Sequence, residues 1–526
     1  MSEPIDAAHH QLLTVFIIYD EIIIRPAGCT ITPSVARRRR RIEITVERWS
    51  ARRGKQTMGH PKRRRHLRID ESFWAWLDSP DTPMHVAALA VFESDNEPTS
   101  AVVKRVMAGF RARTDVHPRF RTVIRMRRFP RRARRELVDH LDLDLHMRHH
   151  VLPDTDDEHA LAQLISHLQS KRLDAGRPMW ELHVIEVLHG NRFALYVKAH
   201  HSLVNGVDAV RMLGRSLTPA ADAITPTPLW TIDGPRPRLT TATGSGRARA
   251  SITEHVSLLF AASKAVARLC RPRRGDSPLT SPFAARRSRI NVDTGPQRRV
   301  RTVSMDLNKL KRLAQASETS VNDVALAACS TALRRYLLDI GELPAKPLIA
   351  GCPVSIAAPE GSAADSSIGI MFADLATNRA DAVARLRTIA RSTRAAKDHQ
   401  AALPHRALLP YSILAMGSHT LRQIAPGAVE HMPPAFNLII SNVPGPPQPL
   451  YLAGARMVEL HPLSLLFKGE ALNITALSYN DRMNFGLTAC ASALPQVDLI
   501  ARYLEDAVAE LETHYASTFP DLSRPA

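Results

Sequence analysis

Hydrophobic and polar residues alternate with two different periods between Ile69 and about Leu217, which predicts strands and helices in turn. Residues 86–92, 182–187 and 192–201 have the pattern of strands, whereas residues 158–173 have that of an amphipathic helix. Strands that alternate with helices are typical of an α/β fold, in which helices cover a sheet. We therefore expect a first α/β domain over residues 66–217.

A stretch rich in Pro, Thr, Ser and Arg follows, from Thr218 to about Pro282. This composition predicts a crossover linker, and within it residues 252–270 fit one helix. The helix carries an apolar stripe made of Ile252, Val256, Leu259, Val266 and Cys270. Such a stripe could rest on a membrane, but packing on the protein's own body is the commoner arrangement, and we favour it here.

The same alternation returns over residues 283–515, where we expect a second α/β domain. The pattern predicts strands at 300–307, 348–354 and 436–440, helices at 321–338 and 497–511, and a hairpin over 471–488 that turns at Asn480-Asp481. Ser320, with Asp323 three residues on, fits an N-cap. The stripe that this helix should bury contains Leu326, Cys329, Leu333 and Leu337.

The length and the charge add two flanking segments to this picture. A chain of 526 residues exceeds the size at which a single hydrophobic core stops growing, so at least two domains are expected. Residues 1–65 hold 14 Lys and Arg against 6 Asp and Glu, which leaves +11 of the net charge of +19 for the other 461 residues. We interpret residues 1–65 as a basic N-terminal extension and expect the true start of the protein to be Met58. The alternative is that 1–65 is a basic arm of the protein. Residues 516–526 are interpreted as a tail.

The moderately basic body favours anionic partners, such as an acidic membrane surface or a phosphate-bearing molecule like coenzyme A. Nucleic-acid binding is not expected, because aromatic residues make up only 5% of the chain. The five cysteines are scattered without metal-ligand spacing, which predicts reduced thiols and no metal. No apolar run of about 18 residues and no secretory leader is found, so we expect a cytoplasmic protein, with peripheral contact at the inner face of the membrane as the alternative.

Candidate chemistry lies in residues 200–206, where His200 and His201 end a strand and Asn205-Gly206 marks a turn before a helix. In a regular strand the two histidines point to opposite faces, so they cannot share one metal ion. One can then serve as an acid or base while the other is structural. The pattern alone favours a structural pair, since most such pairs are structural.

The segment also resembles the His-His-x-x-x-Asp-Gly signature of the chloramphenicol-acetyltransferase-like superfamily in all but one position. Five further segments, in the right order, resemble elements of the bacterial wax ester synthase/diacylglycerol acyltransferase family. They are Pro83-Met84-His85-Val86, residues 173–183 around Arg177-Pro178-Met179-Trp180-Glu181, Val321-Asn322-Asp323-Val324, Ser441-Asn442-Val443-Pro444-Gly445-Pro446 and Ala471-Leu472-Asn473-Ile474-Thr475. The resemblance covers about Leu67 to Leu511.

This resemblance implies two chloramphenicol-acetyltransferase-like domains with an active-site channel between them. It implies an acyl-CoA-dependent O-acyltransferase that makes triacylglycerol from diacylglycerol, or wax esters from long-chain alcohols. His201 would be the general base, His200, Asn205 and Gly206 would have structural roles, and long-chain acyl-CoA would be a co-substrate with no permanently bound cofactor. Trp180 is expected to anchor the core, and Gly206 to let the loop pack closely.

Two departures from the family pattern weaken the expectation of vigorous catalysis. Asn205 replaces the aspartate of the signature, which the resemblance pairs with an arginine, so that restoring the acid should raise activity or stability. Asp365-Ser366-Ser367-Ile368 stands where a Gly-Asn pair is expected. Two alternatives therefore stay open: a weakly active or inactive member that binds lipid or membrane, and, less favoured, a peptide-condensation domain. The latter usually carries Asp-Phe-Gly-Trp-Gly, where this chain has Asn484-Phe485-Gly486-Leu487.

Overall fold

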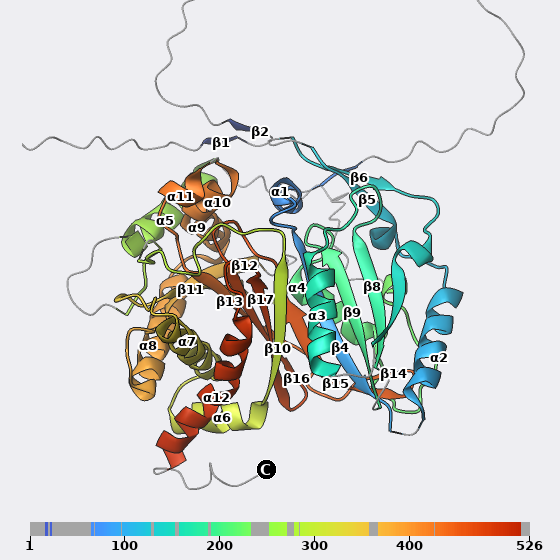
Figure 1. The fold of residues 1–526 in the computed structure, drawn as a ribbon. Coiled ribbons are helices and arrows are strands. Elements are labelled where there is room, and N and C mark those ends of the chain that lie inside the picture. Colours follow the sequence, from blue (N-terminus) through green and yellow to red (C-terminus); the bar gives the residue numbers. More distant parts are fainter. Residues whose placement is uncertain are drawn as a thin grey trace, which may run out of the picture.

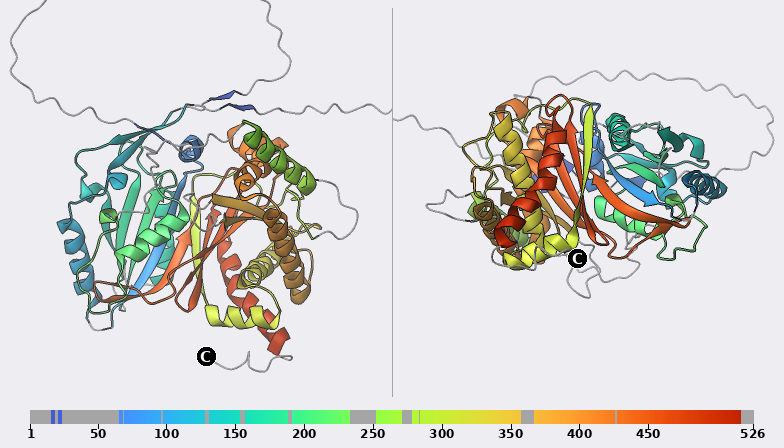
Figure 2. Two further views of the ribbon diagram at one scale, coloured as in Figure 1. Left: turned by 180° about the vertical axis from the view of Figure 1, so that it is seen from behind. Right: turned by 60° about the horizontal axis from the view of Figure 1, so that its bottom comes forward.

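The computed structural model describes most of the chain between residues 65 and 516. The described residues are 16–18, 21–23, 65–67, 69–95, 97–127, 131–152, 157–187, 191–232, 252–270, 278–282, 284–356, 367–425 and 427–516. Most of the extension 1–65 including Met58, the linker residues 233–251, Asp365-Ser366 and the tail from residue 517 lie outside them. Two six-stranded sheets stand side by side and helices cover their outer faces (Figures 1 and 2).

The first sheet has the strand order β14-β15-β4-β9-β8-β7. Its strands are β4 (His85–Glu93), β7 (Met147–Leu152), β8 (Trp180–Val187), β9 (Arg192–His200), β14 (Tyr451–Leu452) and β15 (Ala455–Leu463). Alternate residues of β9 reach different cores: Phe193 and Leu195 pack with α2 (Thr99–Ala112) and α4 (Gly206–Ser216), whereas Ala194 and Tyr196 pack with α3 (Asp157–Ser170). The sheet is therefore covered on both faces.

The second sheet has the order β10-β17-β16-β13-β11-β12. Its strands are β10 (Arg298–Asp306), β11 (Ile349–Ile356), β12 (Ser367–Asp374), β13 (Leu438–Pro444), β16 (Leu472–Tyr479) and β17 (Arg482–Cys490). One face packs on the four helices α6 (Leu307–Ala316), α7 (Val321–Asp339), α8 (Ala382–Ala401) and α12 (Val497–Ala516). The other face packs on α5 (Ile252–Cys270) and α9 (Leu408–Ala415), which lie beside α10 (Gly417–Ile424) and α11 (Ala428–His431).

Strand β15 crosses from the second half of the chain into the first sheet, where it pairs antiparallel with β4. Residues 451–463 therefore lie in the sheet of the first domain, although the sequence pattern places them in 283–515. The crossing is close, because a Cβ added to Gly486 on β17 would lie 1.8 Å from the carbonyl oxygen of Pro462 on β15. Glycine at 486 lets the two backbones touch.

A smaller sheet and one helix lie beside the end of β9. The sheet has the order β3-β6-β5, made of β3 (Arg65–His66), β5 (Thr122–Arg125) and β6 (Arg134–Leu137). The helix is α1 (Ile69–Leu77), which carries Trp74. A further hairpin joins β1 (Phe16–Ile18) and β2 (Glu21–Ile23). Among the described residues, no helix is long and apolar enough to cross a bilayer.

Most elements predicted from the pattern are confirmed, including the capping box of Ser320 and Asp323 on α7 and the turn at Asn480. The predicted buried face of α5 is wrong. The expected stripe of α5 is largely exposed, with Val256 at 60% and Leu259 at 42%, and the helix instead buries Ala262, Ala265 and Leu269. The small side chains of Ala262 and Ala265 let α5 pack closely on the rest of the protein, whereas the larger residues Val256 and Leu259 stay exposed.

Candidate active site

The two histidines of the motif lie on either side of the end of β9. The strand ends at His200, and His201 lies in the turn that leads to α4. The predicted strand is thus one residue too long, because the main-chain N–H of His201 donates to the carbonyl of Met84 (2.8 Å) at the point where the chain turns. The two rings have different neighbours for this reason, rather than through the simple alternation of a strand.

His201 stacks on an aromatic ring and leaves its nitrogens without a partner. Its imidazole lies on the indole of Trp74, with ring centroids 3.9 Å apart and an interplanar angle of 24°. Neither ring nitrogen has a hydrogen-bond partner among the described residues, and Nδ1 is shielded from water. A neutral imidazole held flat against an apolar wall can accept a proton from a bound molecule at its other nitrogen, Nε2.

Burial keeps His201 neutral. Loss of hydration lowers the pKa of His201 to about 4, His200 lowers it further, and only the residue's own main chain works in the opposite direction. The proton-accepting form of His201 therefore predominates at every pH well above 4.

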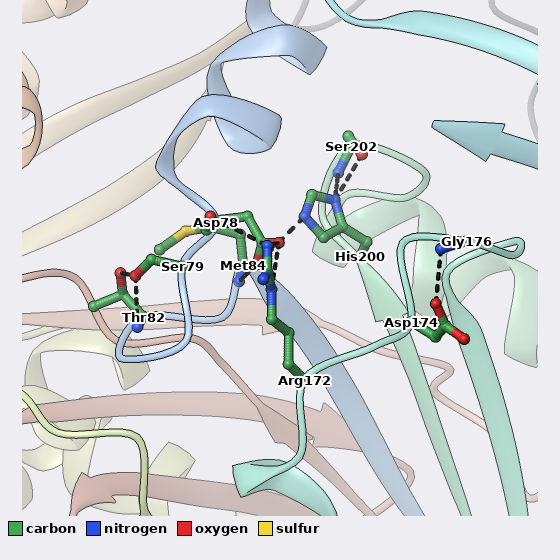
Figure 3. Close-up of polar contacts among 9 residues, drawn as sticks. All are labelled: Asp78, Ser79, Thr82, Met84, Arg172, Asp174, Gly176, His200 and Ser202. Atoms are coloured by element: carbon green, nitrogen blue, oxygen red, sulfur yellow. Dashed lines mark hydrogen bonds and ion pairs between the residues drawn. The ribbon is translucent and has the colours of Figure 1, made fainter. Parts of the chain in front are cut away.

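His200 is held by hydrogen-bond contacts with Ser202 at Nδ1, whereas its Nε2 has no hydrogen-bond partner among the described residues (Figure 3). The main-chain N–H of Ser202 donates to Nδ1 (3.2 Å), and the Ser202 Oγ lies 2.6 Å from the same atom. Nε2 faces the buried carboxylate of Asp78 at 3.9 Å. Burial lowers the pKa of His200 to about 4, although the nearby Asp78 carboxylate raises it. His200 thus has the anchored environment of a structural residue.

The carboxylate of Asp78 contacts three other segments of the chain next to His200. One of its oxygens accepts the main-chain N–H of Met84 (2.9 Å), and the other accepts Nε of Arg172 (2.9 Å), as Figure 3 shows. Met84 is also the residue whose carbonyl binds His201, so Asp78 fixes the chain that positions this histidine.

Several motif segments that are distant in sequence meet here. The main chain of His200 donates to the carbonyl of Met179, which lies in the Arg-Pro-Met-Trp-Glu segment. The next residue, Trp180, is buried as expected, and its Nε1 donates to the carbonyl of Phe120 (2.9 Å). Segments 83–86, 173–183 and 200–206 therefore form one structural unit.

Asn205 caps helix α4. Its Oδ1 accepts the main-chain N–H of Asp208 (2.8 Å), and its Nδ2 donates to the Asp208 carboxylate (3.0 Å). The partner expected from the resemblance was an arginine, but among the described residues the side chain of Asn205 bonds only Asp208. A Cβ on Gly206 would have nothing within 4 Å, so the close packing expected there is not seen.

Replacing Asn205 with Asp should therefore destabilise the protein, contrary to the expectation from the signature. A second carboxylate would face Asp208 across about 3 Å and would lose the amide donor, while the cap itself would survive. We expect urea denaturation at pH 7 to show a loss of about 1–2 kcal/mol. The exchange variant Asn205→Asp/Asp208→Asn, which separates amide and acid again, should recover part of the loss. If Asn205→Asp alone is as stable as the wild type, the contact between Asn205 Nδ2 and the Asp208 carboxylate does not stabilise the protein.

One motif segment of the second half, the Asn-Val-Pro-Gly-Pro loop at 442–446, approaches helix α4. Asn442 Nδ2 donates to Oδ1 of Asn322 (3.3 Å), which joins the Asn-Val-Pro-Gly-Pro loop to the start of α7. In that loop, Pro446 lies against Gly214 of α4, at 3.6 Å from an added Cβ. The loop therefore packs behind the helix that follows the histidines.

Three residues of the site were not predicted from the sequence: Trp74, Asp78 and Arg172. Each lies within ten residues of a segment that the motif comparison marked, but no pattern of hydrophobicity or spacing pointed to these side chains. Only the pairing of β4 with β9, which aligns His85 with His200, brings them to the motif.

Comparisons with known proteins give matches over most of the chain. Residues 67–325 match the family model described as wax ester synthase/diacylglycerol acyltransferase catalytic domain, and residues 366–512 match the WS/DGAT C-terminal domain. A Mycobacterium tuberculosis protein named probable diacylglycerol O-acyltransferase is 34% identical over 451 residues, which are 84% of this chain and 98% of that protein.

Two solved structures resemble the fold. The wax ester synthase/diacylglycerol acyltransferase from Marinobacter aquaeolei VT8 superposes with a TM-score of 0.69 at 31% identity, over 86% of this chain and 99% of that one. The first condensation domain of the calcium-dependent antibiotic synthetase gives a TM-score of 0.52 at 13% identity, over 86% and 97% of the two chains. The second likeness concerns the fold alone.

Proposed function

The chain belongs to the wax ester synthase/diacylglycerol acyltransferase family, and on that basis we propose that it transfers a long-chain acyl group from acyl-CoA to the hydroxyl of diacylglycerol, or of a long-chain alcohol. The observation that carries this proposal is His201, a neutral imidazole stacked on Trp74 with no partner for its nitrogens among the described residues. A general base that must bind a substrate hydroxyl needs such a free acceptor.

The proposed reaction is a direct transfer. Nε2 of His201 takes the proton of the acceptor hydroxyl while that oxygen attacks the thioester carbonyl carbon. When the tetrahedral intermediate collapses, the carbon–sulfur bond breaks and the proton passes from His201 to the departing thiolate of coenzyme A. The thiols of Cys329 and Cys352 do not serve as nucleophiles in this scheme, since burial raises the pKa of both to about 12.

The low pKa of His201 predicts an unusual pH profile. The base form is lost only as the pH falls toward 4, so kcat/KM should change little between pH 7 and pH 5.5. A histidine with its ordinary pKa near 6.5 would lose about tenfold over that interval. Initial rates at acceptor concentrations well below KM, measured beside circular dichroism at each pH, test this. A tenfold fall in a protein that stays folded would contradict the proposed environment.

An acceptor panel tests the proposed substrates. Purified protein would be given long-chain acyl-CoA with diacylglycerol, a long-chain alcohol or no acceptor, while thiol release and labelled ester are followed. We expect thiol and ester in equal amounts with at least one acceptor. The second candidate function, lipid binding with little turnover, rests on Asn205 in the signature, and it would be favoured by bound diacylglycerol without ester.

We further propose that the protein contacts an anionic membrane or lipid droplet peripherally. Both candidate acceptors partition into lipid phases, so an enzyme that uses them gains access by binding such a surface. The basic character of the chain supports attraction to anionic headgroups.

A further inference from the structure

Exposed apolar side chains gather on three helices at one end of the molecule. Of thirteen large hydrophobic residues that are exposed among the described ones, eight lie on α5, α9 and α10. We call these eight the apolar end face: Val256, Leu259, Phe260, Leu409, Ile413, Leu414, Leu421 and Ile424. Helix α9 contacts both α5 and α10. Figure 1 and the left view of Figure 2 show the three helices together, near α1.

Helix α5 carries two apolar faces rather than one. Ala262, Ala265 and Leu269 are buried against the body, whereas Phe260 is 69% exposed. A helix that only packs on its own protein needs a single apolar face, and its outer side is normally polar. A second apolar face of this kind indicates an interaction surface.

The charges around the apolar end face are mostly positive, although Glu254 lies at the start of α5 and Glu430 lies on α11. Segments 255–270 and 405–425 contain no Asp or Glu, and their charged residues are Lys264, Arg268, Arg406 and Arg422. Arg422 is buried, so the other three are the cations near the surface. Large apolar side chains beside cations are the combination that binds the headgroup region of an anionic bilayer.

Apolar contacts connect the inner side of this face to His201. Residues of α5 and α9 belong to the same hydrophobic cluster as Phe436 and Phe467, and Trp74 packs against that cluster. The rings of Trp74 and Phe467 are 6.1 Å apart, and Trp74 stacks on His201. Apolar side chains thus extend from the end face to the candidate base.

We propose that the apolar end face docks on an anionic phospholipid bilayer and that the lipid acceptor enters the protein at this end. The proposal rests on the function proposed above, because it assigns the source of the acceptor for that reaction. Phe260 and Ile413 insert among the acyl chains, while Lys264, Arg268 and Arg406 lie at the headgroups.

The test uses the full chain and vesicles of phosphatidylcholine with and without phosphatidylglycerol. Phe260→Ser/Ile413→Ser removes apolar groups that are 69% and 54% exposed, so the fold should tolerate the change. Ile224→Ser/Leu338→Ser is the matched control, because these residues are 59% and 50% exposed elsewhere on the molecule. We expect the first variant to bind anionic vesicles about tenfold more weakly than the wild type, and the control to bind like the wild type.

Activity separates this proposal from the catalytic one. Phe260→Ser/Ile413→Ser should lose turnover of diacylglycerol in anionic vesicles yet keep it with a water-soluble short-chain alcohol, while His201→Ala should bind vesicles normally. Equal vesicle binding by both double variants would overturn the docking face. Equally strong binding of the wild type to vesicles without phosphatidylglycerol would overturn the proposed preference for an anionic bilayer. Weakened binding in a protein whose wild type makes no ester would leave the docking face standing and reject the enzyme.

Discussion

His201→Ala is expected to lower kcat/KM for ester formation by about 10²–10⁴ while the protein stays folded, because general-base assistance contributes a factor of that size. Of the two histidines of the motif, His201 is the one whose ring nitrogens both lack a hydrogen-bond partner among the described residues. Thiol release from long-chain acyl-CoA in the presence of the acceptor measures the loss. Binding of acyl-CoA should change much less, since the base acts on the acceptor hydroxyl.

A matched control separates this effect from the loss of any histidine. His159→Ala removes an exposed imidazole on α3 whose one hydrogen-bond partner among the described residues is Gln163, and the variant should keep full activity. Thermal unfolding of each variant checks that the stack on Trp74 is not needed for folding. If His201→Ala turns over like the wild type, another group is the base.

Gly486→Ala is expected to destabilise the protein by about 3 kcal/mol or more, or to prevent folding. The added Cβ would lie 1.8 Å from the carbonyl oxygen of Pro462 and 2.9 Å from Leu463, both on β15. Backbone atoms cannot turn away as a flexible side chain can, so β15 would have to move away from β17. That strand carries the second half of the chain into the first sheet, and urea denaturation measures the cost.

Gly295→Ala is the matched control for this substitution. Its Cβ would lie 3.7 Å from Ser492 Oγ, an ordinary contact, and Gly295 does not have a left-handed backbone. We expect a change of about 0.5 kcal/mol or less in either direction. A Gly486→Ala protein as stable as the Gly295→Ala protein would mean that the two strands do not pass as closely as described.

Local patterning predicted much of the fold but could not predict which strands pair. Strand β9, helix α7 and the hairpin at Asn480 lie close to where the hydrophobic pattern places them, although β9 is buried on both of its faces. The crossing of β15 into the first sheet depends on contacts between residues more than 360 positions apart, such as Arg456 with Glu93. Strand periodicity has no information about such a partner.

The second failure concerns α5, where the pattern indicated the wrong face. The stripe of larger hydrophobic residues suggests burial, but the body accepts the side with Ala262 and Ala265. Counting hydrophobicity alone favours large residues, whereas close helix packing is limited by side-chain volume.

For the site, the sequence motif located the histidines but not their surroundings. His200 and His201 were found by resemblance, and the structure gives them different environments: contacts with Ser202 and Asp78 for one, and a free imidazole on Trp74 for the other. Trp74 and Asp78 lie more than 120 residues before the motif. They become neighbours only when β4 pairs with β9, so no local pattern could identify them.

The most direct test of the proposed direct transfer is a single turnover with labelled long-chain acyl-CoA, run with and without diacylglycerol or a long-chain alcohol. Thiol release, labelled ester and the intact mass of the protein are measured together. We predict one thiol released per ester formed, only when an acceptor is present, with an unchanged protein mass. A burst of thiol without acceptor, accompanied by a protein heavier by one acyl group, would contradict it.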